Sequence, residues 1–203
     1  FHLVGHDWGS SVGWAFIAEH PERLYSWTSL SIPHMKAFQE AYRSDFDQQR
    51  RSKYIRFFNM PFFPELYLSF NGYKNLKSIW RAHDDEEKEA YLSVFRQSGA
   101  LRSALNWYRA NIGKHRNPTD HINFGIVEVP SLLIWGNMDM AIGRKSIVLN
   151  KQYMGGPYNF LELYAGHWLI QESFDDVSKA IIKHIKTYSL EYYEPQLGER
   201  RKK

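Results

Sequence analysis

An apolar segment that ends in a tight, glycine-flanked turn opens the chain and constrains its fold more than any other feature. Residues 1–4 form an apolar run, Gly5-His6-Asp7-Trp8-Gly9 follows, and the next residues have the pattern of an amphipathic helix. Strand, sharp turn and helix form the setting of a nucleophile elbow, Gly-x-nucleophile-x-Gly. The glycines allow close approach of the chain while the central residue takes a strained conformation. The sequence therefore predicts that Asp7 stands at a tight turn between a strand and a helix.

The central position of this turn holds a carboxylate and not a hydroxyl group. A hydroxyl suits attack on an acyl carbon, whereas a carboxylate can displace a leaving group from a saturated carbon and form an alkyl ester. The same pattern also occurs in ordinary loops, where Asp often caps the following helix. Asp7 thus has two interpretations, a nucleophile or a helix cap, and the choice depends on finding a base and an acid to accompany it.

Strand patterns occur at both ends of the chain and flank a long segment without β-like alternation. Three segments have the pattern of a strand: residues 24–32, 131–136 and 159–164. The second of these segments is continuously apolar, as parallel sheets require. The intervening residues carry helical patterns, among them one over residues 45–58, which a Pro- and Phe-rich bend at residues 60–64 follows. We therefore expect an α/β fold, with a parallel-sheet core over residues 1–33 and 125–203 and an all-helical cap insert over residues 34–124.

Two further strand ends carry side chains capable of acid–base chemistry. Asp139 follows the strand at 131–136, and His167 follows the strand at 159–164. The carboxyl ends of parallel strands meet at one edge of a sheet, where ligands gather. We predict that Asp7, Asp139 and His167 meet there as nucleophile, acid and base, in the chain order of a hydrolase triad.

Three motifs carry a resemblance to a known family. The motifs resemble segments of the α/β-hydrolase family and, within it, of the epoxide hydrolases and haloalkane dehalogenases. They are Gly5-His6-Asp7-Trp8-Gly9, Trp135-Gly136-Asn137-Met138-Asp139 and Gly166-His167-Trp168. The resemblance covers nearly the whole chain but only the later part of a typical member. The early strands and the His-Gly-x-Pro loop of the oxyanion hole do not appear, so we expect an amino-terminally truncated sequence.

Tyrosines in the insert favour the epoxide hydrolase branch. Opening an epoxide leaves an alkoxide that needs a proton, which a buried tyrosine can donate. Leu105-Asn106-Trp107-Tyr108-Arg109 resembles the second lid-tyrosine motif of epoxide hydrolases, and Tyr54, spaced from Phe58 and Pro61, resembles the first. The resemblance implies that Tyr54 and Tyr108 hold the epoxide oxygen. The substrate-binding residues that we expect beside them are aromatic: Trp8, Phe58, Trp107 and Trp168.

The function that the resemblance implies is hydrolysis of a small apolar epoxide to a vicinal diol. Water would hydrolyse a covalent alkyl ester on Asp7, and no metal or organic cofactor is expected. One alternative is a haloalkane dehalogenase with the same triad, and another is a non-catalytic protein that keeps the fold. An ordinary esterase is disfavoured because Asp7 replaces serine. The sequence does not indicate which epoxide is used or what the oligomeric state is.

Composition excludes several other kinds of protein. The chain has no cysteine, which excludes disulfides and thiolate–zinc sites and is compatible with a reducing compartment, so we expect a cytoplasmic location. The net charge of +4 equals the charge of the last four residues, and the balanced remainder does not favour nucleic-acid binding. The sequence contains no apolar run of about 18 residues, so it predicts no membrane span. Asp84-Asp85-Glu86-Glu87 is interpreted as the first turn of a helix and not as a metal site.

Overall fold

The computed structural model describes residues 1–112 and 121–189, which fall into two compact units. The first unit combines Phe1–Gln49 with the chain from Ile122 onward, and the second is Arg50–His121. The first unit includes α2 (Met35–Ser44), which packs against α8 (Arg144–Asn150). The division therefore falls after Gln49, whereas the sequence interpretation began the insert at residue 34.

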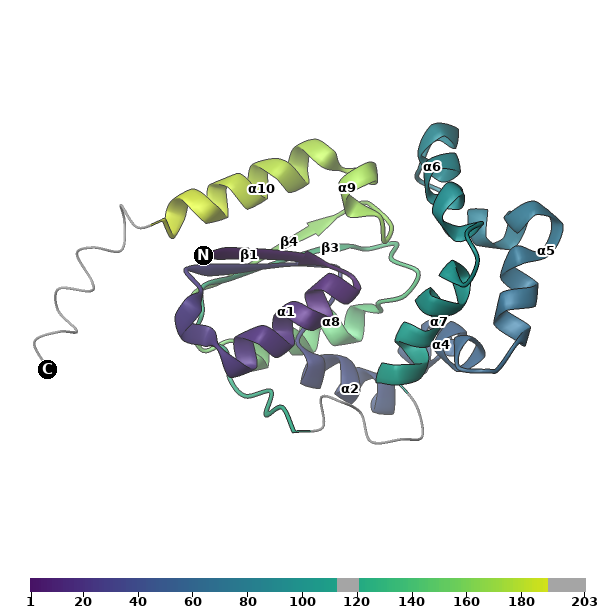
Figure 1. Ribbon diagram of the computed structural model, residues 1–203. Coiled ribbons are helices and arrows are strands. Elements are labelled where there is room, and N and C mark those ends of the chain that lie inside the picture. Colours follow the sequence, from purple (N-terminus) through teal and green to yellow (C-terminus); the bar gives the residue numbers. More distant parts are fainter. Residues whose placement is uncertain (113–120, 190–203) are drawn as a thin grey trace, which may run out of the picture. The chain divides into compact units, whose positions relative to one another are not determined.

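A four-stranded parallel sheet forms the centre of the first unit (Figure 1). The spatial order is the chain order, β1-β2-β3-β4, and adjacent strands pair in parallel. The strand ends are in register, since His6 pairs with Leu30 and Leu30 with Ile134. All four carboxyl ends thus share one edge, and the predicted parallel sheet is confirmed. The strands are β1 (His2–His6), β2 (Ser26–Leu30), β3 (Ser131–Gly136) and β4 (Tyr158–Leu163).

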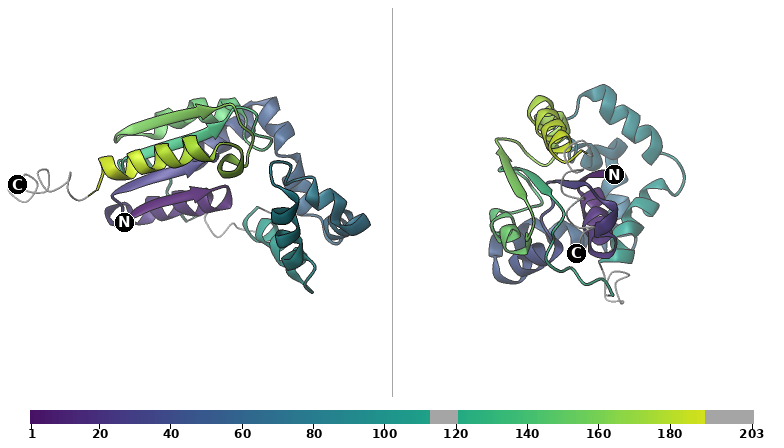
Figure 2. Two further views of the ribbon diagram at one scale, coloured as in Figure 1. Left: turned by 90° about the horizontal axis from the view of Figure 1, so that it is seen from above. Right: turned by 90° about the vertical axis from the view of Figure 1, so that its left-hand side faces the viewer.

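Helices cover both faces of this sheet (Figures 1 and 2). α1 (Trp8–Glu19) and α8 lie on one face, and α10 (Phe174–Thr187) lies on the other. β1 is connected to β2 through α1, and β3 to β4 through α8, as expected for an α/β fold. The connection from β2 to β3 contains the second unit. A short helix that the sequence pattern did not predict, α9 (Leu169–Glu172), precedes α10.

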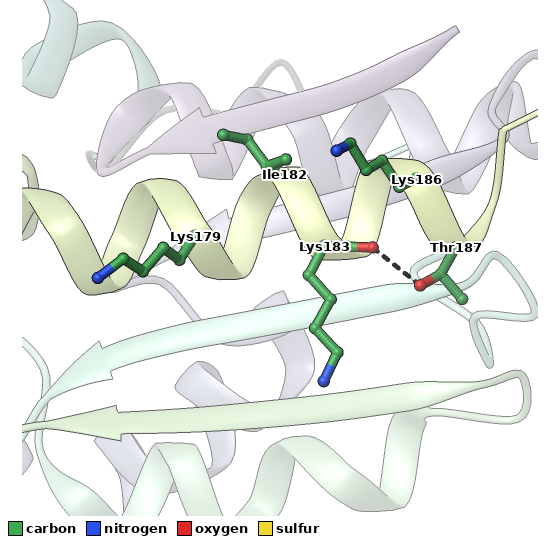
Figure 3. Close-up of a pocket in the computed structure, with 5 residues that line it drawn as sticks. All are labelled: Lys179, Ile182, Lys183, Lys186 and Thr187. Atoms are coloured by element: carbon green, nitrogen blue, oxygen red, sulfur yellow. Dashed lines mark hydrogen bonds between the residues drawn. The ribbon is translucent and has the colours of Figure 1, made fainter.

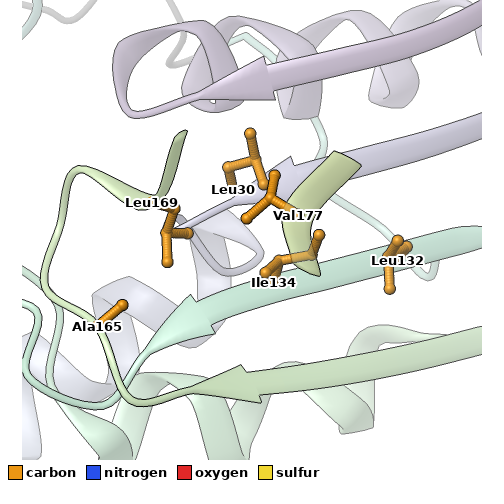
Figure 4. Close-up of a cluster of buried hydrophobic side chains, with 6 residues drawn as sticks. All are labelled: Leu30, Leu132, Ile134, Ala165, Leu169 and Val177. Carbon is orange, nitrogen blue, oxygen red and sulfur yellow. The ribbon is translucent and has the colours of Figure 1, made fainter. Parts of the chain in front are cut away.

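The core on the α10 side contains small and branched aliphatic side chains from the sheet, from α9 and α10, and from the loop before α9 (Figure 4). Leu169 of α9 is fully buried there, and Val177 of α10 is 3% exposed. Burial of one such side chain contributes about 1.5–3 kcal/mol. Leu169 therefore anchors the chain two residues after His167. The cluster consists of Leu30, Leu132, Ile134, Ala165, Leu169 and Val177.

The core on the other face contains two tryptophans, Trp14 of α1 and Trp27 of β2. Trp14 and Trp27 lie edge to face, with ring centroids 5.4 Å apart. A Cβ atom on Gly13 would lie 2.1 Å from the Trp27 ring. Only glycine allows α1 to approach the sheet at this distance. This approach brings the first turn of α1 against the end of β1.

All the elements of the second unit that the structure describes are helical, as predicted for the insert. The expected helix over residues 45–58 is divided at Ser52 into α3 and α4. Residues 63–77, whose beginning overlaps the predicted Pro- and Phe-rich bend, form α5, which non-helical residues interrupt at positions 70–73. The predicted acidic first turn is confirmed because Asp84 accepts a hydrogen bond from the Glu87 N–H. The helices are α3 (Phe46–Arg51, across the boundary), α4 (Lys53–Phe58), α5 (Phe63–Lys77), α6 (Asp85–Phe95) and α7 (Ala100–Asn111).

Two shallow grooves lie outside the predicted site. One of about 470 Å³ runs along α10, where Lys179, Lys183 and Lys186 line it with Ile182 and Thr187 (Figure 3). Another of about 620 Å³ lies in the second unit, where α4 and α5 meet. Neither groove is lined by a residue predicted for the site. Within the described ranges, the helices are too short or too polar for any of them to traverse a bilayer.

Candidate active site

The turn between β1 and α1 holds Asp7 in a strained conformation. Its φ of 51° lies in the left-handed region, which costs free energy for a residue other than glycine. A Cβ atom on Gly5 would lie 2.6 Å from the Gly9 carbonyl oxygen, so α1 returns directly over the strand end. The Asp7 side chain makes no capping hydrogen bond to α1. Asp7 thus occupies the N-cap position of α1, but its side chain does not act as the helix cap.

The imidazole of His167 lies between two carboxylates. Its Nδ1 atom is 2.9 Å from Oδ2 of Asp139, and its Nε2 atom is 3.1 Å from Oδ1 of Asp7. Asp139 is fully buried and His167 is 8% exposed, whereas a third of the Asp7 side chain is exposed. The structure thus brings together all three residues predicted from the strand ends. It leaves the Asp7 carboxylate accessible from one side.

The Asp139 carboxylate is fixed by its own turn. Oδ1 accepts hydrogen bonds from the N–H groups of Ala141 at 2.7 Å and Ile142 at 3.1 Å. Oδ2 is left to accept from His167 Nδ1. Since a carboxylate can only accept, this contact assigns a proton to Nδ1 and turns Nε2 toward Asp7. Asp139 therefore determines both the ring orientation and the tautomer of His167.

Burial and hydrogen bonding shift the pKa values of His167 and Asp7 in opposite directions. Burial alone would lower the pKa of His167, but hydrogen bonds to Asp139 and Asp7 raise it to about 10. Burial would raise the pKa of Asp7, but hydrogen bonds from His167 and from the Trp8 N–H lower it below its ordinary value. At neutral pH the resting site therefore holds an imidazolium between carboxylates. The Trp8 N–H is already directed at the Asp7 carboxyl group.

The aromatic residues predicted from the insert form a cluster within the second unit. The Tyr54 and Tyr108 ring centroids are 6.1 Å apart, and Phe58 lies 5.0 Å from Tyr108. Trp107 differs from this group because 47% of its surface is exposed. In the first unit, the Trp168 ring lies 5.5 Å from that of His167, and Trp8 follows Asp7 at the start of α1. Of the predicted aromatic residues, Trp107 is the one that the structure leaves half exposed.

Sequence reasoning missed three polar residues beside His167. His6 Nε2 lies 2.8 Å and Ser31 Oγ 3.3 Å from the His167 carbonyl oxygen. Glu172 accepts from the N–H groups of Gly166 and Trp168. His6 and Ser31 end or follow strands at the same edge as Asp7, which was an available signal. Glu172 had none, because α9 itself was not predicted.

Comparison with known sequences identifies a family and a set of relatives. The profile described as alpha/beta hydrolase fold matches residues 1–173. Epoxide hydrolase 4 of Homo sapiens is 33% identical over 196 residues, covering 91% of this chain and 53% of that protein. Epoxide hydrolase 3 of Xenopus tropicalis is 30% identical over 197 residues, covering 91% of this chain and 52% of that protein. The chain spans about half the length of these curated relatives.

Solved structures share the fold at lower sequence identity. An epoxide hydrolase from Bacillus megaterium in complex with an inhibitor has a TM-score of 0.79 at 21% identity, covering 90% of this chain and 68% of that one. The crystal structure of "a Putative Acyltransferase from Salmonella enterica" has a TM-score of 0.78 at 19% identity, covering 93% of this chain and 65% of that one. Fold similarity alone therefore does not distinguish these reactions, and the residues of the site must.

Proposed function

Because the chain belongs to the α/β-hydrolase fold family, we propose that it is the core and cap portion of an epoxide hydrolase that acts through a covalent ester on Asp7. The substrate class is a small apolar epoxide, and water is the second substrate. The observation that carries this proposal is the position of His167 between Asp7 and Asp139, with a carboxylate at the elbow where esterases hold serine. The similarity to epoxide hydrolases 3 and 4 supports the same substrate class.

In the first step, an Asp7 oxygen forms a bond to one epoxide carbon as the carbon–oxygen bond of the ring breaks. The ring oxygen becomes an alkoxide and takes a proton from Tyr54 or Tyr108, whose rings lie together in the second unit. Ester formation removes the negative charge of Asp7, which is one of the groups that raise the pKa of His167. His167 then releases its proton, which restores the phenol. The product of this step is a neutral hydroxyalkyl ester.

In the second step, the neutral His167 acts as a base. Its Nε2 takes a proton from water, and the resulting hydroxide attacks the carboxyl carbon of Asp7. The Trp8 N–H, which donates to this carboxyl group, stabilises the tetrahedral oxyanion. Collapse of that intermediate breaks the ester bond, and imidazolium returns its proton to the departing diol oxygen. The Asp7 carboxylic acid that remains then gives its proton to His167, which restores the resting imidazolium and carboxylate. Asp139 keeps the imidazole oriented in both protonation states.

The mechanism separates into two steps that one substitution can isolate. We expect His167→Gln in the full-length protein to permit alkylation by styrene oxide but to prevent hydrolysis of the ester. The mass of the intact protein should then increase by one molecule of styrene oxide. His20→Gln, at the exposed end of α1, is the matched control and should turn over without accumulating the adduct.

Three outcomes would contradict the proposal. The first is no adduct on His167→Gln together with no diol from the wild type. The second is an adduct that persists when Asp7→Asn is combined with His167→Gln, because the ester would then lie elsewhere. The third is halide release from a simple bromoalkane without styrene oxide turnover, which would indicate a dehalogenase.

A further inference from the structure

The loop that carries His167 is held by side chains that the proposed mechanism does not use. We call residues Ala165–Trp168 the base loop. The peptide group between His167 and Trp168 is bound at both ends, since its oxygen accepts from His6 Nε2 at 2.8 Å and its N–H donates to Glu172 Oε1 at 3.1 Å. Glu172 Oε2 accepts a second bond from the Gly166 N–H at 2.6 Å. The peptide that follows the His167 Cα atom and the peptide between Ala165 and Gly166 are therefore both held by neighbouring side chains.

His6 connects this loop directly to the strand that carries Asp7. It is the last residue of β1, and its ring lies 5.0 Å from the His167 ring and 5.8 Å from the Trp168 ring. The Asp7 carboxylate is one residue further along the chain. A displacement of β1 relative to the base loop would therefore change the contact of His6 with the loop together with the contact between Asp7 and His167.

The hydrogen-bonding roles around the His167 carbonyl oxygen are unambiguous. A carbonyl oxygen only accepts, so His6 must carry a proton on Nε2. Burial and the nearby charge of His167 lower the pKa of His6, which leaves its other ring nitrogen unprotonated. Ser31 adds its hydroxyl to the same oxygen at 3.3 Å and has a positive φ of 69°. A strained backbone directed at one carbonyl is a feature of sites whose geometry must be maintained.

We propose that His6 is a positioning residue, whose Nε2–H and the opposing Glu172 carboxylate hold the His167–Trp168 peptide so that the imidazole meets Asp7 at hydrogen-bond distance. The kinetic part of this inference rests on the proposed function, whereas its geometric part does not. The Asp139 contact orients the imidazole ring, but the position of the His167 backbone sets the distance from Nε2 to Asp7. Misplacement of a reacting group by about 1 Å can cost 10²-fold in rate.

The kinetic test compares two substitutions of His6 with one on the same strand. His6→Phe keeps a ring but removes the donor, whereas His6→Gln places an amide N–H near the position of Nε2. His2→Phe, at the start of β1, is the control, since His2 bonds to Ser26 Oγ. Ester formation and ester hydrolysis are measured separately in single turnovers of styrene oxide with the full-length protein.

We expect His6→Phe to slow ester hydrolysis by about tenfold or more, on the scale set by misplacement of a reacting group. Ester formation should change much less, because that step does not use His167 as a base. His6→Gln should restore most of the hydrolysis rate, and His2→Phe should leave both rates unchanged. Glu172→Gln, which leaves one acceptor for two N–H donors, should give a smaller decrease than His6→Phe.

Wild-type ester hydrolysis in His6→Phe would overturn the proposal. Equal losses in His6→Phe and His6→Gln would also overturn it, because ring packing and not the hydrogen bond would then be responsible. A second readout is independent of catalysis. The low-field NMR signal of the His167 Nδ1 proton, bonded to Asp139, should broaden or shift in His6→Phe and remain in His6→Gln and His2→Phe. If no epoxide alkylates the wild type, the proposed function fails, yet this signal still decides whether His6 positions the base.

Discussion

Nε2 of His167 lies 3.1 Å from Oδ1 of Asp7, although 160 residues separate them in the chain. The contact requires the ends of β1 and β4 to meet at one edge, which the parallel order β1-β2-β3-β4 provides. It also requires the Asp7 side chain to point toward His167 and not to cap α1. In this site the Asp7 carboxylate helps to stabilise the imidazolium form of His167, so the base carries a proton at rest.

The charge state of His167 predicts a pH dependence of stability. Its pKa is about 10 in the folded protein, against 6.5 in the unfolded chain. The stabilisation is thus fully present below pH 6.5 and is lost as the pH rises through about 10. Since one unit of difference corresponds to about 1.4 kcal/mol, we expect a loss of a few kcal/mol between these limits. Denaturant unfolding of the wild type and of His167→Gln at pH 7 and pH 10 measures this loss of unfolding free energy.

The free energy of unfolding of His167→Gln should decrease markedly less between pH 7 and pH 10 than that of the wild type. That of His20→Gln should decrease as much as in the wild type. An equal decrease in all three proteins would show that His167 is not charged at rest. His34 does not interfere in this range. Its pKa is lowered by burial to about 4, so it destabilises the fold only as the pH falls below 6.5.

The positions of Asp7, Asp139 and His167 could be predicted from the sequence because each follows a strand pattern. In a parallel sheet, that placement alone brings side chains to one edge. His6 also ends a strand pattern, but that position alone does not indicate what its side chain contacts. Its contact is with a carbonyl group 161 residues away, and side-chain patterns do not reveal which backbone groups a fold brings close.

Helix boundaries in the insert were less predictable than the sheet. The pattern over residues 45–58 is continuous, but the structure separates α3 from α4 at Ser52, which is buried. α5 includes Asn71 and Tyr73 at positive φ, a conformation that no local sequence rule assigns to tyrosine. Tertiary packing decides these positions. The sequence could therefore indicate an all-helical insert without indicating where each helix ends.

The glycines of α1 give a test of helix–sheet packing with a control in the same helix. A Cβ atom at Gly13 would lie 2.1 Å from the buried Trp27 ring, whereas one at Gly9 would meet nothing within 4 Å. We expect Gly13→Ala to destabilise the first unit by about 2 kcal/mol or more through overpacking. Gly9→Ala should be neutral or slightly stabilising, since alanine is favoured in helices. Thermal unfolding distinguishes them, and equal melting temperatures would contradict the close approach.

The two tyrosines of the second unit should affect the first chemical step only. Tyr54→Phe and Tyr108→Phe remove the proton for the alkoxide, so ester formation should slow by about 10²-fold or more. Hydrolysis of ester already formed should be unaffected. Tyr67→Phe, on the exposed side of α5, is the control and should react as the wild type does. Slowed hydrolysis with unchanged ester formation in the two variants would reject the proton-donor role.

Arg109 should stabilise the helix that carries Tyr108. Its guanidinium group donates two hydrogen bonds to Glu65, at 2.8 and 2.9 Å, and a third to the Met60 carbonyl oxygen at 2.8 Å. Lysine cannot reproduce this planar arrangement. Because both side chains remain about a fifth exposed, we expect Arg109→Lys to cost about 1–2 kcal/mol. Amide hydrogen exchange in α7 should accelerate accordingly. Arg96→Lys, whose partner Glu89 is exposed, should leave that exchange unchanged, and equal protection of α7 in both variants would show that the Arg109 contacts contribute no stability.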